Sequence, residues 1–277
     1  GFYVQVSHQL GSNDPARARN TLRQGIMSVL VVSALIGLVS LAVSPFLPVW
    51  LGGGSDITPT ASAYFAIVAT ALPIFQFSIF GAGMLRSSGN MVVPSVMSVV
   101  MMSLDVVFNF FLIFPTRPVQ LFGAEVTIPG MGMGVVGAAI GTVSAELVAA
   151  SITMYILCFR SKELSLRIDT GRFLPTWGVV KRALHISLPM GLQQTIMCSA
   201  YVMTTIIIAP LGTFAIAANS FGVIVESLCY MPGYGIADAA TTLVGQSIGA
   251  GRHELMKRFA WLSVGLGVTV MAVMGVV

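Results

Sequence analysis

Asp105 and Asn109 are polar residues in an otherwise apolar segment, MMSLDVVFNFFLIF, which spans residues 101–114. Four positions separate them, so they share one face of a helix and lie about one turn apart. A carboxylate and an amide carbonyl supply the oxygen ligands that suit a hard cation. A carboxyl group that loses its hydration is also a candidate carrier of a proton. The pair therefore predicts a binding site for a small cation or a proton.

Thr142 and Glu146 have the same spacing in the next apolar segment, and Glu226 and Asp238 lie in a later one. A charge at the centre of a bilayer costs at least ~2.5–3.5 kcal/mol, so intramembrane acids usually face a polar interior. We expect Asp105, Asn109 and Thr142 to form a polar pocket between helices, with the three other acids as secondary candidates. The alternative is a set of hydrogen bonds that only holds the helices together, and for Glu146 neither interpretation is favoured.

The solvent around these segments follows from composition. Hydrophobic residues make up 56% of the 277 residues and charged residues 9%, whereas soluble domains carry about 25% charged residues. Apolar runs long enough to cross a bilayer predict full spans at residues 25–50, 61–84, 93–114, 134–159, 184–208 and 214–247, with partial spans at 1–10 and 259–277. We expect an all-α membrane protein, and because both ends interrupt apolar runs, a fragment of a longer chain.

Basic residues predict how the chain is oriented. Thirteen of the fourteen Lys and Arg residues fall in alternate loops between the predicted spans, and Arg117 is the exception. By the positive-inside rule those loops face the cytoplasm, which predicts a multi-pass protein of the inner membrane. The net charge of +4 then reflects this orientation, and we expect no nucleic-acid partner.

Two motifs superficially indicate an enzyme. GMGVVG at 132–137 matches a dinucleotide-binding loop, and GQSIG at 245–249 matches a nucleophile elbow. The first motif requires a strand within a βαβ unit and the second a strand-to-helix turn, whereas both lie in predicted spans. Close helix packing explains these glycines better. The three cysteines show no metal-ligand spacing. We therefore expect no catalytic residues, no metal and no organic cofactor.

Prolines indicate where the spans depart from straight helices. Pro73, Pro189 and the cluster Pro232–Gly235 lie inside predicted spans. Backbone groups that a proline frees in a membrane must be satisfied by neighbouring groups or by water. We expect a break at 232–235 that lines a cavity.

A weak internal repeat joins the beginning of the chain to a later segment. YVQVSHQLGSND at 3–14 aligns with TTLVGQSIGAGR at 241–252 at a constant offset of 238, so that Val6 matches Val244 and Gly11 matches Gly249. Both copies end an apolar run beside a basic loop. Transporters are often built from such repeats, which favours a protein with two related bundles.

Four stretches together resemble the multidrug and toxic compound extrusion (MATE) family of secondary transporters. They are SHQLGSND at 7–14, LRSSGN at 85–90, GMGVVGAAIGT at 132–142 and LVGQSIGAG at 243–251. The resemblance implies a two-lobe transporter whose six-helix bundles are related by inverted or pseudo-symmetry, truncated here to six full helices and two partial ones. Residues 1–159 would form the N-lobe from its second to its sixth helix, 160–183 a cytoplasmic linker and 184–277 part of the C-lobe.

The resemblance also implies a cation site. Some members carry an Asn-x-x-x-Asp pair on the fifth helix and a threonine on the sixth. Here the pair reads Asp105-x-x-x-Asn109, with the residue types exchanged, and the threonine would be Thr142. In the C-lobe, where some members place a glutamate in the seventh helix, span 184–208 has no acid, and Glu226 is the visible candidate.

The expected function is therefore a secondary active antiporter that exports cationic or amphipathic compounds in exchange for protons or sodium ions. Its expected partners are small organic cations and the lipid bilayer, and we expect a monomer. The alternative is a lipid-linked oligosaccharide flippase of related architecture. A flippase would need basic residues to hold pyrophosphate, and the six predicted full spans contain neither lysine nor arginine.

Overall fold

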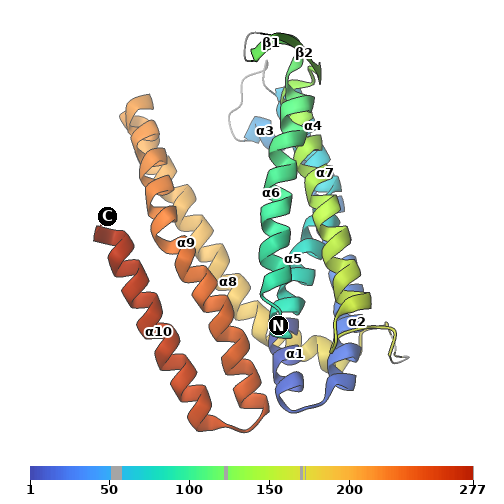
Figure 1. Cartoon of the computed structure of the whole chain (residues 1–277). Coiled ribbons are helices and arrows are strands. Elements are labelled where there is room, and N and C mark those ends of the chain that lie inside the picture. The colour runs from blue at the N-terminus through green and yellow to red at the C-terminus, as the bar shows by residue number, and fades with distance from the viewer. Residues whose placement is uncertain (51–57, 122–123, 169–170, 172, 277) are drawn as a thin grey trace. The chain divides into compact units, whose positions relative to one another are not determined.

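The computed structural model describes residues 1–50, 58–121, 124–168, 171 and 173–276. Helices dominate it (Figure 1). In chain order the elements are α1 (Phe2–Gly11), α2 (Pro15–Val43), α3 (Leu47–Trp50), α4 (Thr58–Thr70), α5 (Leu72–Ser87), α6 (Val92–Ile113), β1 (Pro115–Leu121), β2 (Ala124–Met131), α7 (Gly134–Tyr155) with a π-helical extension (Ile156–Arg160), α8 (Trp177–Ile208), a 3-10 turn (Ala209–Leu211), α9 (Thr213–Gly249) and α10 (His253–Val276).

The chain forms two compact units. Unit 1 comprises Gly1–Thr21, Arg86–Gly89 and Pro175–Val277, and unit 2 comprises Leu22–Leu85 and Asn90–Leu174. Unit 1 therefore holds α1, α8, α9 and α10, and unit 2 holds α3, α4, α6 and α7 together with most of α2 and α5. Helix α8 begins at Trp177, within the segment that the sequence assigned to a linker.

Among the described residues, five helices are long and apolar enough to cross a membrane: Pro15–Val43, Val92–Ile113, Gly134–Arg160, Trp177–Ile208 and His253–Gly275. The pair α4 and α5, bent by 46°, would make a sixth span. The prediction of an all-α, multi-pass membrane protein is confirmed. One assignment differs in detail. Residues 259–276, expected as part of a partial span, belong to α10, which is long and apolar enough to cross a membrane by itself.

Helix α9 is long and carries a few polar residues among many apolar ones. It runs for 37 residues, more than the roughly 20 that cross a bilayer, and it includes Asn219, Glu226 and Asp238. The expected break at 232–235 is wrong, because α9 continues through Pro232 just as α8 continues through Pro189. A proline removes one backbone donor, and neighbouring groups can compensate for that loss in a membrane helix. A bend does occur beside Pro73, between α4 and α5.

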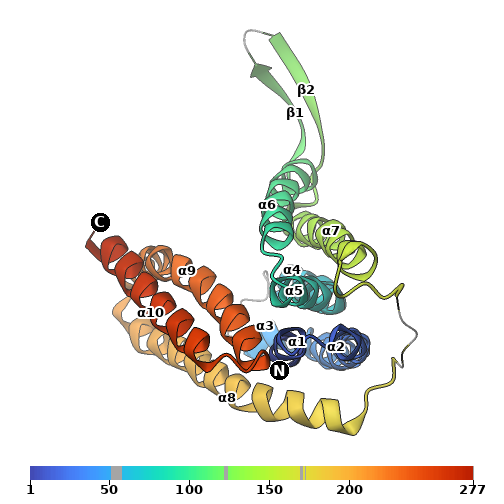
Figure 2. The same ribbon diagram turned by 60° about the horizontal axis from the view of Figure 1, so that its bottom comes forward.

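A two-stranded antiparallel hairpin, β1 with β2, joins α6 to α7 and was not predicted. Figure 2 shows it extending from the ends of these two helices. Gly132 and Gly134 lead from β2 into α7 with positive φ angles of 63° and 56°, which glycine adopts without steric cost. GMGVVG therefore does follow a strand, but that strand belongs to a hairpin and not to the βαβ unit that a dinucleotide site requires.

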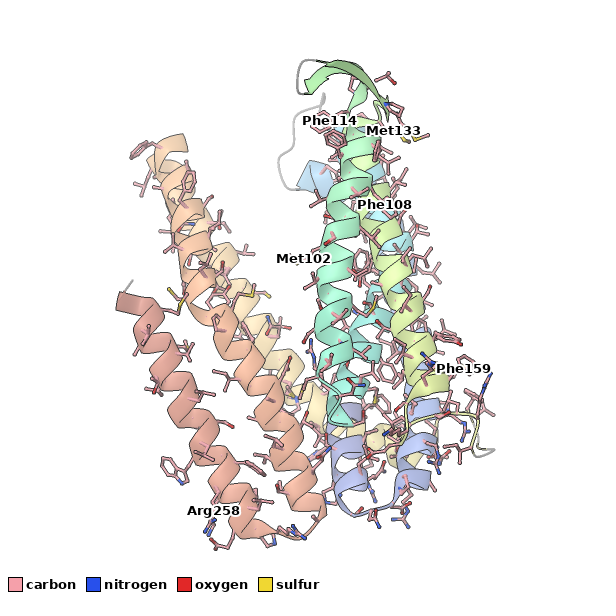
Figure 3. The ribbon with its side chains drawn as sticks, viewed as in Figure 1. Met102, Phe108, Phe114, Met133, Phe159 and Arg258 are labelled. Carbon is pink, nitrogen blue, oxygen red and sulfur yellow. The ribbon has the colours of Figure 1, made fainter. Side chains whose placement is uncertain are left out.

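Helix α6 exposes an apolar stripe. Val92, Val99, Met102 and Val106 are each between 65% and 71% exposed, and Met102 points away from the helix in Figure 3. In water such a stripe would be an unfavourable apolar patch. In a bilayer it is the face that lipid chains cover, so the remaining faces of α6 are available for packing and for polar groups.

Helices α1 and α9 pack through a reciprocal contact within unit 1. A β-carbon on Gly11 would collide with the backbone carbonyl of Gln246, and one on Gly249 would collide with the carbonyl of His8. At the repeat offset, Gly11 corresponds to Gly249 and His8 to Gln246. The two contacts are therefore equivalent, as they must be when a two-fold axis relates two segments.

The repeat position Ser7 and its counterpart Gly245 lie against each other. The β-carbon of Ser7 would be 2.9 Å from a β-carbon on Gly245. Equivalent residues meet in this way only beside the symmetry axis. The weak sequence repeat thus corresponds to a local pseudo-two-fold packing of α1 on α9.

Gly11→Ala is expected to destabilise the complete protein by about 1–3 kcal/mol, because the added methyl overpacks a backbone contact. The matched control is Gly267→Ala in α10, where a β-carbon would meet nothing within 4 Å. Thermal unfolding in detergent measures both variants. If Gly11→Ala is as stable as the Gly267 variant, the close approach of α1 and α9 is not present in the protein.

Candidate cation site on helices α6 and α7

Helices α6 and α7 approach closely where α7 has two glycines four positions apart (Figure 1). A β-carbon on Gly137 would lie 2.5 Å from the carbonyl oxygen of Leu112, and one on Gly141 would collide with Oδ1 of Asn109. Small residues at this spacing allow helix backbones to approach in membranes. The expectation that the glycines of GMGVVGAAIG serve packing is therefore confirmed for these two positions.

Asp105 and Asn109 each contain an unsatisfied oxygen. Oδ1 of Asp105 and Oδ1 of Asn109 are shielded from solvent and have no hydrogen-bond partner. Both side chains are half-buried, and they lie one turn apart on α6 as the sequence predicted. Because nearly all buried polar atoms in proteins have a partner, each such exception calls for an explanation, and an absent ion or water is a common one.

The antiparallel register of the two helices places the remaining predicted residues. Leu112 is level with Gly137 and Asn109 with Gly141. One turn further along, Asp105 is level with Ala145, whose side chain is fully buried. Thr142 follows Gly141 and is half-buried at the level of Asn109. The structure therefore brings Asp105, Asn109 and Thr142 to neighbouring levels of one helix pair.

Glu146 lies beside Ala145, at the level of Asp105, and is only 6% exposed. Among the described residues, no hydrogen bond or salt bridge joins its carboxyl group to another residue. Glu146 therefore adds a second carboxyl group, on helix α7, one residue from the level of Asp105.

The polar side chains of this region carry oxygen ligands. Asp105 and Glu146 contribute carboxyl groups, Asn109 an amide carbonyl and Thr142 a hydroxyl, while α6 and α7 contain neither lysine nor arginine. Oxygen ligands of this kind suit hard cations.

The two remaining candidate acids, both in α9, have different surroundings. Asp238 forms a salt bridge with Arg86 at the end of α5, so its charge already has a partner. Glu226 is exposed on α9. Sequence reasoning missed the pairing of Arg86 with Asp238, because 152 positions separate the two residues and no local pattern links them. Both acids lie on α9 in unit 1, whereas α6 and α7 belong to unit 2.

The nucleophile-elbow match GQSIG lies inside helix α9. Its serine, Ser247, donates a hydrogen bond to the carbonyl of Leu243, 2.7 Å away in the preceding turn. A nucleophile elbow is a sharp turn between a strand and a helix. This segment has no such turn, and its glycines Gly245 and Gly249 contact α1 instead.

Known proteins match this chain over most of its length. A family model described as MatE matches residues 1–111 and 189–277. A probable multidrug resistance protein NorM of Thermotoga maritima is 27% identical over 258 residues, which are 92% of this chain and 52% of that protein. A protein of the same description from Xanthomonas axonopodis pv. citri is 26% identical over 261 residues, which are 93% of this chain and 54% of that protein. The chain thus spans about half the length of these relatives.

Solved structures share the fold. A crystal structure of MATE in complex with MaD3S has a TM-score of 0.82 at 21% identity, and the match covers 98% of this chain and 57% of that one. A multidrug resistance MATE family transporter of the MOP superfamily, in an outward-facing conformation, has a TM-score of 0.80 at 21% identity, with the same coverage. At this identity the likeness concerns the fold.

Gly137→Ala and Gly141→Ala are expected to differ in thermal stability, although both add one methyl group to α7. The first methyl meets the backbone carbonyl of Leu112, which cannot move without shifting α6, so we expect a loss of about 1–3 kcal/mol. The second meets the end of the Asn109 side chain, which can rotate away, so we expect a smaller loss. Equal midpoints of thermal unfolding for the two variants would contradict this register of α6 and α7.

Proposed function

The chain belongs to the MatE family, and on that basis we propose that the complete protein containing it is a secondary active antiporter of the inner membrane. It exports cationic or amphipathic organic compounds in exchange for protons or sodium ions. The two NorM relatives are described as probable multidrug resistance proteins, which supports this substrate class. We propose a transporter and not an enzyme.

The observation that carries the proposal is the pair of unsatisfied oxygens on α6, Oδ1 of Asp105 and Oδ1 of Asn109. They lie in a helix of 22 residues that is apolar enough to span a membrane. Hydrocarbon offers neither oxygen a donor or a counter-ion, so the energetic cost is removed only by water, a proton or a cation. A binding site for the coupling ion accounts for both atoms together.

Coupling follows from competition between two ligands for two conformations. A proton or sodium ion at Asp105 stabilises the conformation in which the site is closed around it. The exported cation stabilises the other conformation, and each ligand shifts the equilibrium only by its differential affinity for the two. Thr142 and Asn109 complete the set of oxygen ligands, and Glu146 supplies a second carboxyl group within the same helix pair.

The distribution of charge supports export of cations. Helices α6 and α7 carry two acids and no basic residue, so an organic cation meets no repulsion along them. The lysines and arginines near helix ends support the orientation in which these ends face the cytoplasm. A lipid-linked oligosaccharide flippase would instead need basic residues inside the helices to hold pyrophosphate, so we favour the antiporter.

Asp105→Asn in the complete protein is expected to abolish ion-coupled export, because the amide keeps the size of the side chain but carries no charge and takes up no proton. We expect the rate of export of a fluorescent cation from vesicles to fall at least tenfold. Glu254→Gln, which removes an exposed acid from the first turn of α10, is the matched control and should leave the rate unchanged.

Imposed gradients identify the coupling ion in the same vesicles. Wild-type export should respond either to a proton gradient or to a sodium gradient, and Asp105→Asn should remove that response. Thermal unfolding confirms that the variant is folded. Undiminished coupled export by a folded Asp105→Asn variant would exclude Asp105 from the mechanism.

A further inference from the structure

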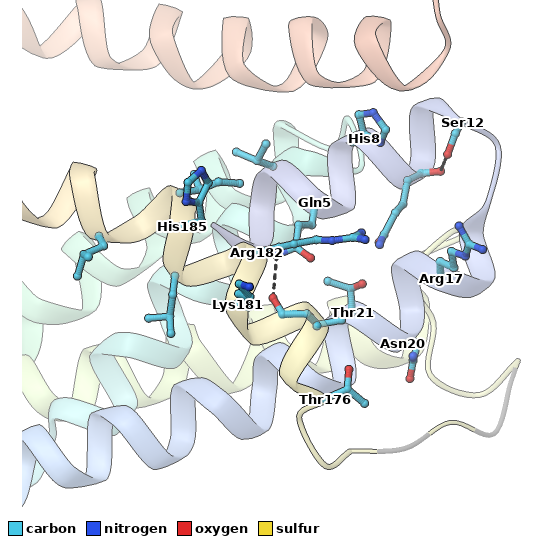
Figure 4. Close-up of a pocket in the computed structure, with 17 residues that line it drawn as sticks. Gln5, His8, Ser12, Arg17, Asn20, Thr21, Thr176, Lys181, Arg182 and His185 are labelled. Atoms are coloured by element: carbon cyan, nitrogen blue, oxygen red, sulfur yellow. Dashed lines mark hydrogen bonds between the residues drawn. The ribbon is translucent and has the colours of Figure 1, made fainter.

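A cavity of about 1330 Å³ lies within unit 1, lined by α1, the beginning of α2 and the first turns of α8. Figure 4 shows Lys181, Arg182 and His185 projecting from α8, and His8, Ser12 and Arg17 on the other side. Its volume exceeds the roughly 300–1,000 Å³ of a site for a drug-sized ligand. Nothing in the coupling mechanism uses these residues.

The described charged residues that line this cavity are all basic, and we call it the basic pocket. Arg17, Lys181 and Arg182 line it, and none of the described residues in its lining is acidic. Arg17 forms a salt bridge of 3.2 Å with Asp14, which lies outside the pocket. Lys181 and Arg182 have no hydrogen bond or salt bridge to any described residue. Two adjacent cations without counter-ions favour an anion, and phosphate is the anion that Lys and Arg side chains commonly bind.

The side of the pocket along α8 is apolar. Leu184 and Leu188 line it and are 51% and 73% exposed, and Val4 of α1 adds a third apolar side chain. A free anion gains nothing from such a surface. An amphiphile does, because its hydrocarbon covers these side chains while its head group remains at the helix ends.

We propose that the basic pocket binds the head group of an acidic phospholipid. The phosphate lies between Lys181 and Arg182, and the acyl chains follow Leu184 and Leu188 into the bilayer. Basic pockets at the ends of membrane helices bind anionic lipids by this chemistry. The cationic compounds assigned to the export route are repelled by this pocket, so the lipid site is separate from that route. Inorganic phosphate shares the head-group chemistry but not the apolar contact.

The test measures lipid binding to the complete protein purified in a neutral detergent. Phosphatidylglycerol, phosphatidylcholine or inorganic phosphate is titrated, and the midpoint of thermal unfolding gives an apparent affinity for each. We expect phosphatidylglycerol to stabilise the wild type, and the double variant Lys181→Gln with Arg182→Gln to bind it at least tenfold more weakly. The doubly conservative variant Lys181→Arg with Arg182→Lys should retain binding, because it keeps both charges.

The matched control is Lys257→Gln with Arg258→Gln on α10, which removes the same charge from exposed positions outside the basic pocket (Figure 3). This variant should bind phosphatidylglycerol like the wild type. An equal loss in the control would mean attraction by surface charge alone and would overturn the proposal. Equal stabilisation by phosphatidylcholine would also overturn it, as would full stabilisation by inorganic phosphate with no further gain from the lipid.

Discussion

The close approach of α6 and α7 determines the environment of the polar residues on α6. Gly137 and Gly141 leave room for Leu112 and Asn109, so the helices meet along the side of α6 that includes Asn109. An apolar stripe that includes Val99 and Met102 stays free for lipid. With larger residues at the glycine positions, the amide of Asn109 would lose its place against α7. Helix packing thus creates a shielded position for polar atoms that lipid alone would not tolerate.

Glycines also allow a close helix contact between α1 and α9. A backbone carbonyl of the opposite helix packs directly against Gly11, and another packs against Gly249. The two contacts are equivalent under the sequence repeat. Backbone carbonyls that approach glycine leave no volume for another residue type, so this packing constrains the sequence strongly at the two glycines. The other positions of the repeat can diverge more freely, because the backbone contacts at Gly11 and Gly249 do not depend on their side chains. This explains why the repeat is weak in sequence and clear in packing.

Sequence reasoning predicted what depends on local composition. The spans followed from hydropathy, and the shared face of Asp105 and Asn109 followed from helical periodicity. The unpredicted features depend on contacts between distant segments. The hairpin after α6 pairs two strands in a segment that contains three prolines, Pro115, Pro118 and Pro129. The salt bridge between Arg86 and Asp238 joins separate helices. The expected break at Pro232 was wrong because proline residues signal lost backbone bonds but not whether neighbouring groups replace them.

The acids of α6 and α7 have no basic neighbour in their helices, and the described lining of the basic pocket contains no acid. Asp238 differs, because its charge is paired with Arg86 within the protein. Oδ1 of Asp105 is shielded from solvent without a hydrogen-bond partner, which lowers the stability of the isolated protein. A bound proton or cation would recover that free energy. Lys181 and Arg182 are exposed, so water solvates their charges at little cost, and an anionic ligand gains by contacting both charges at once.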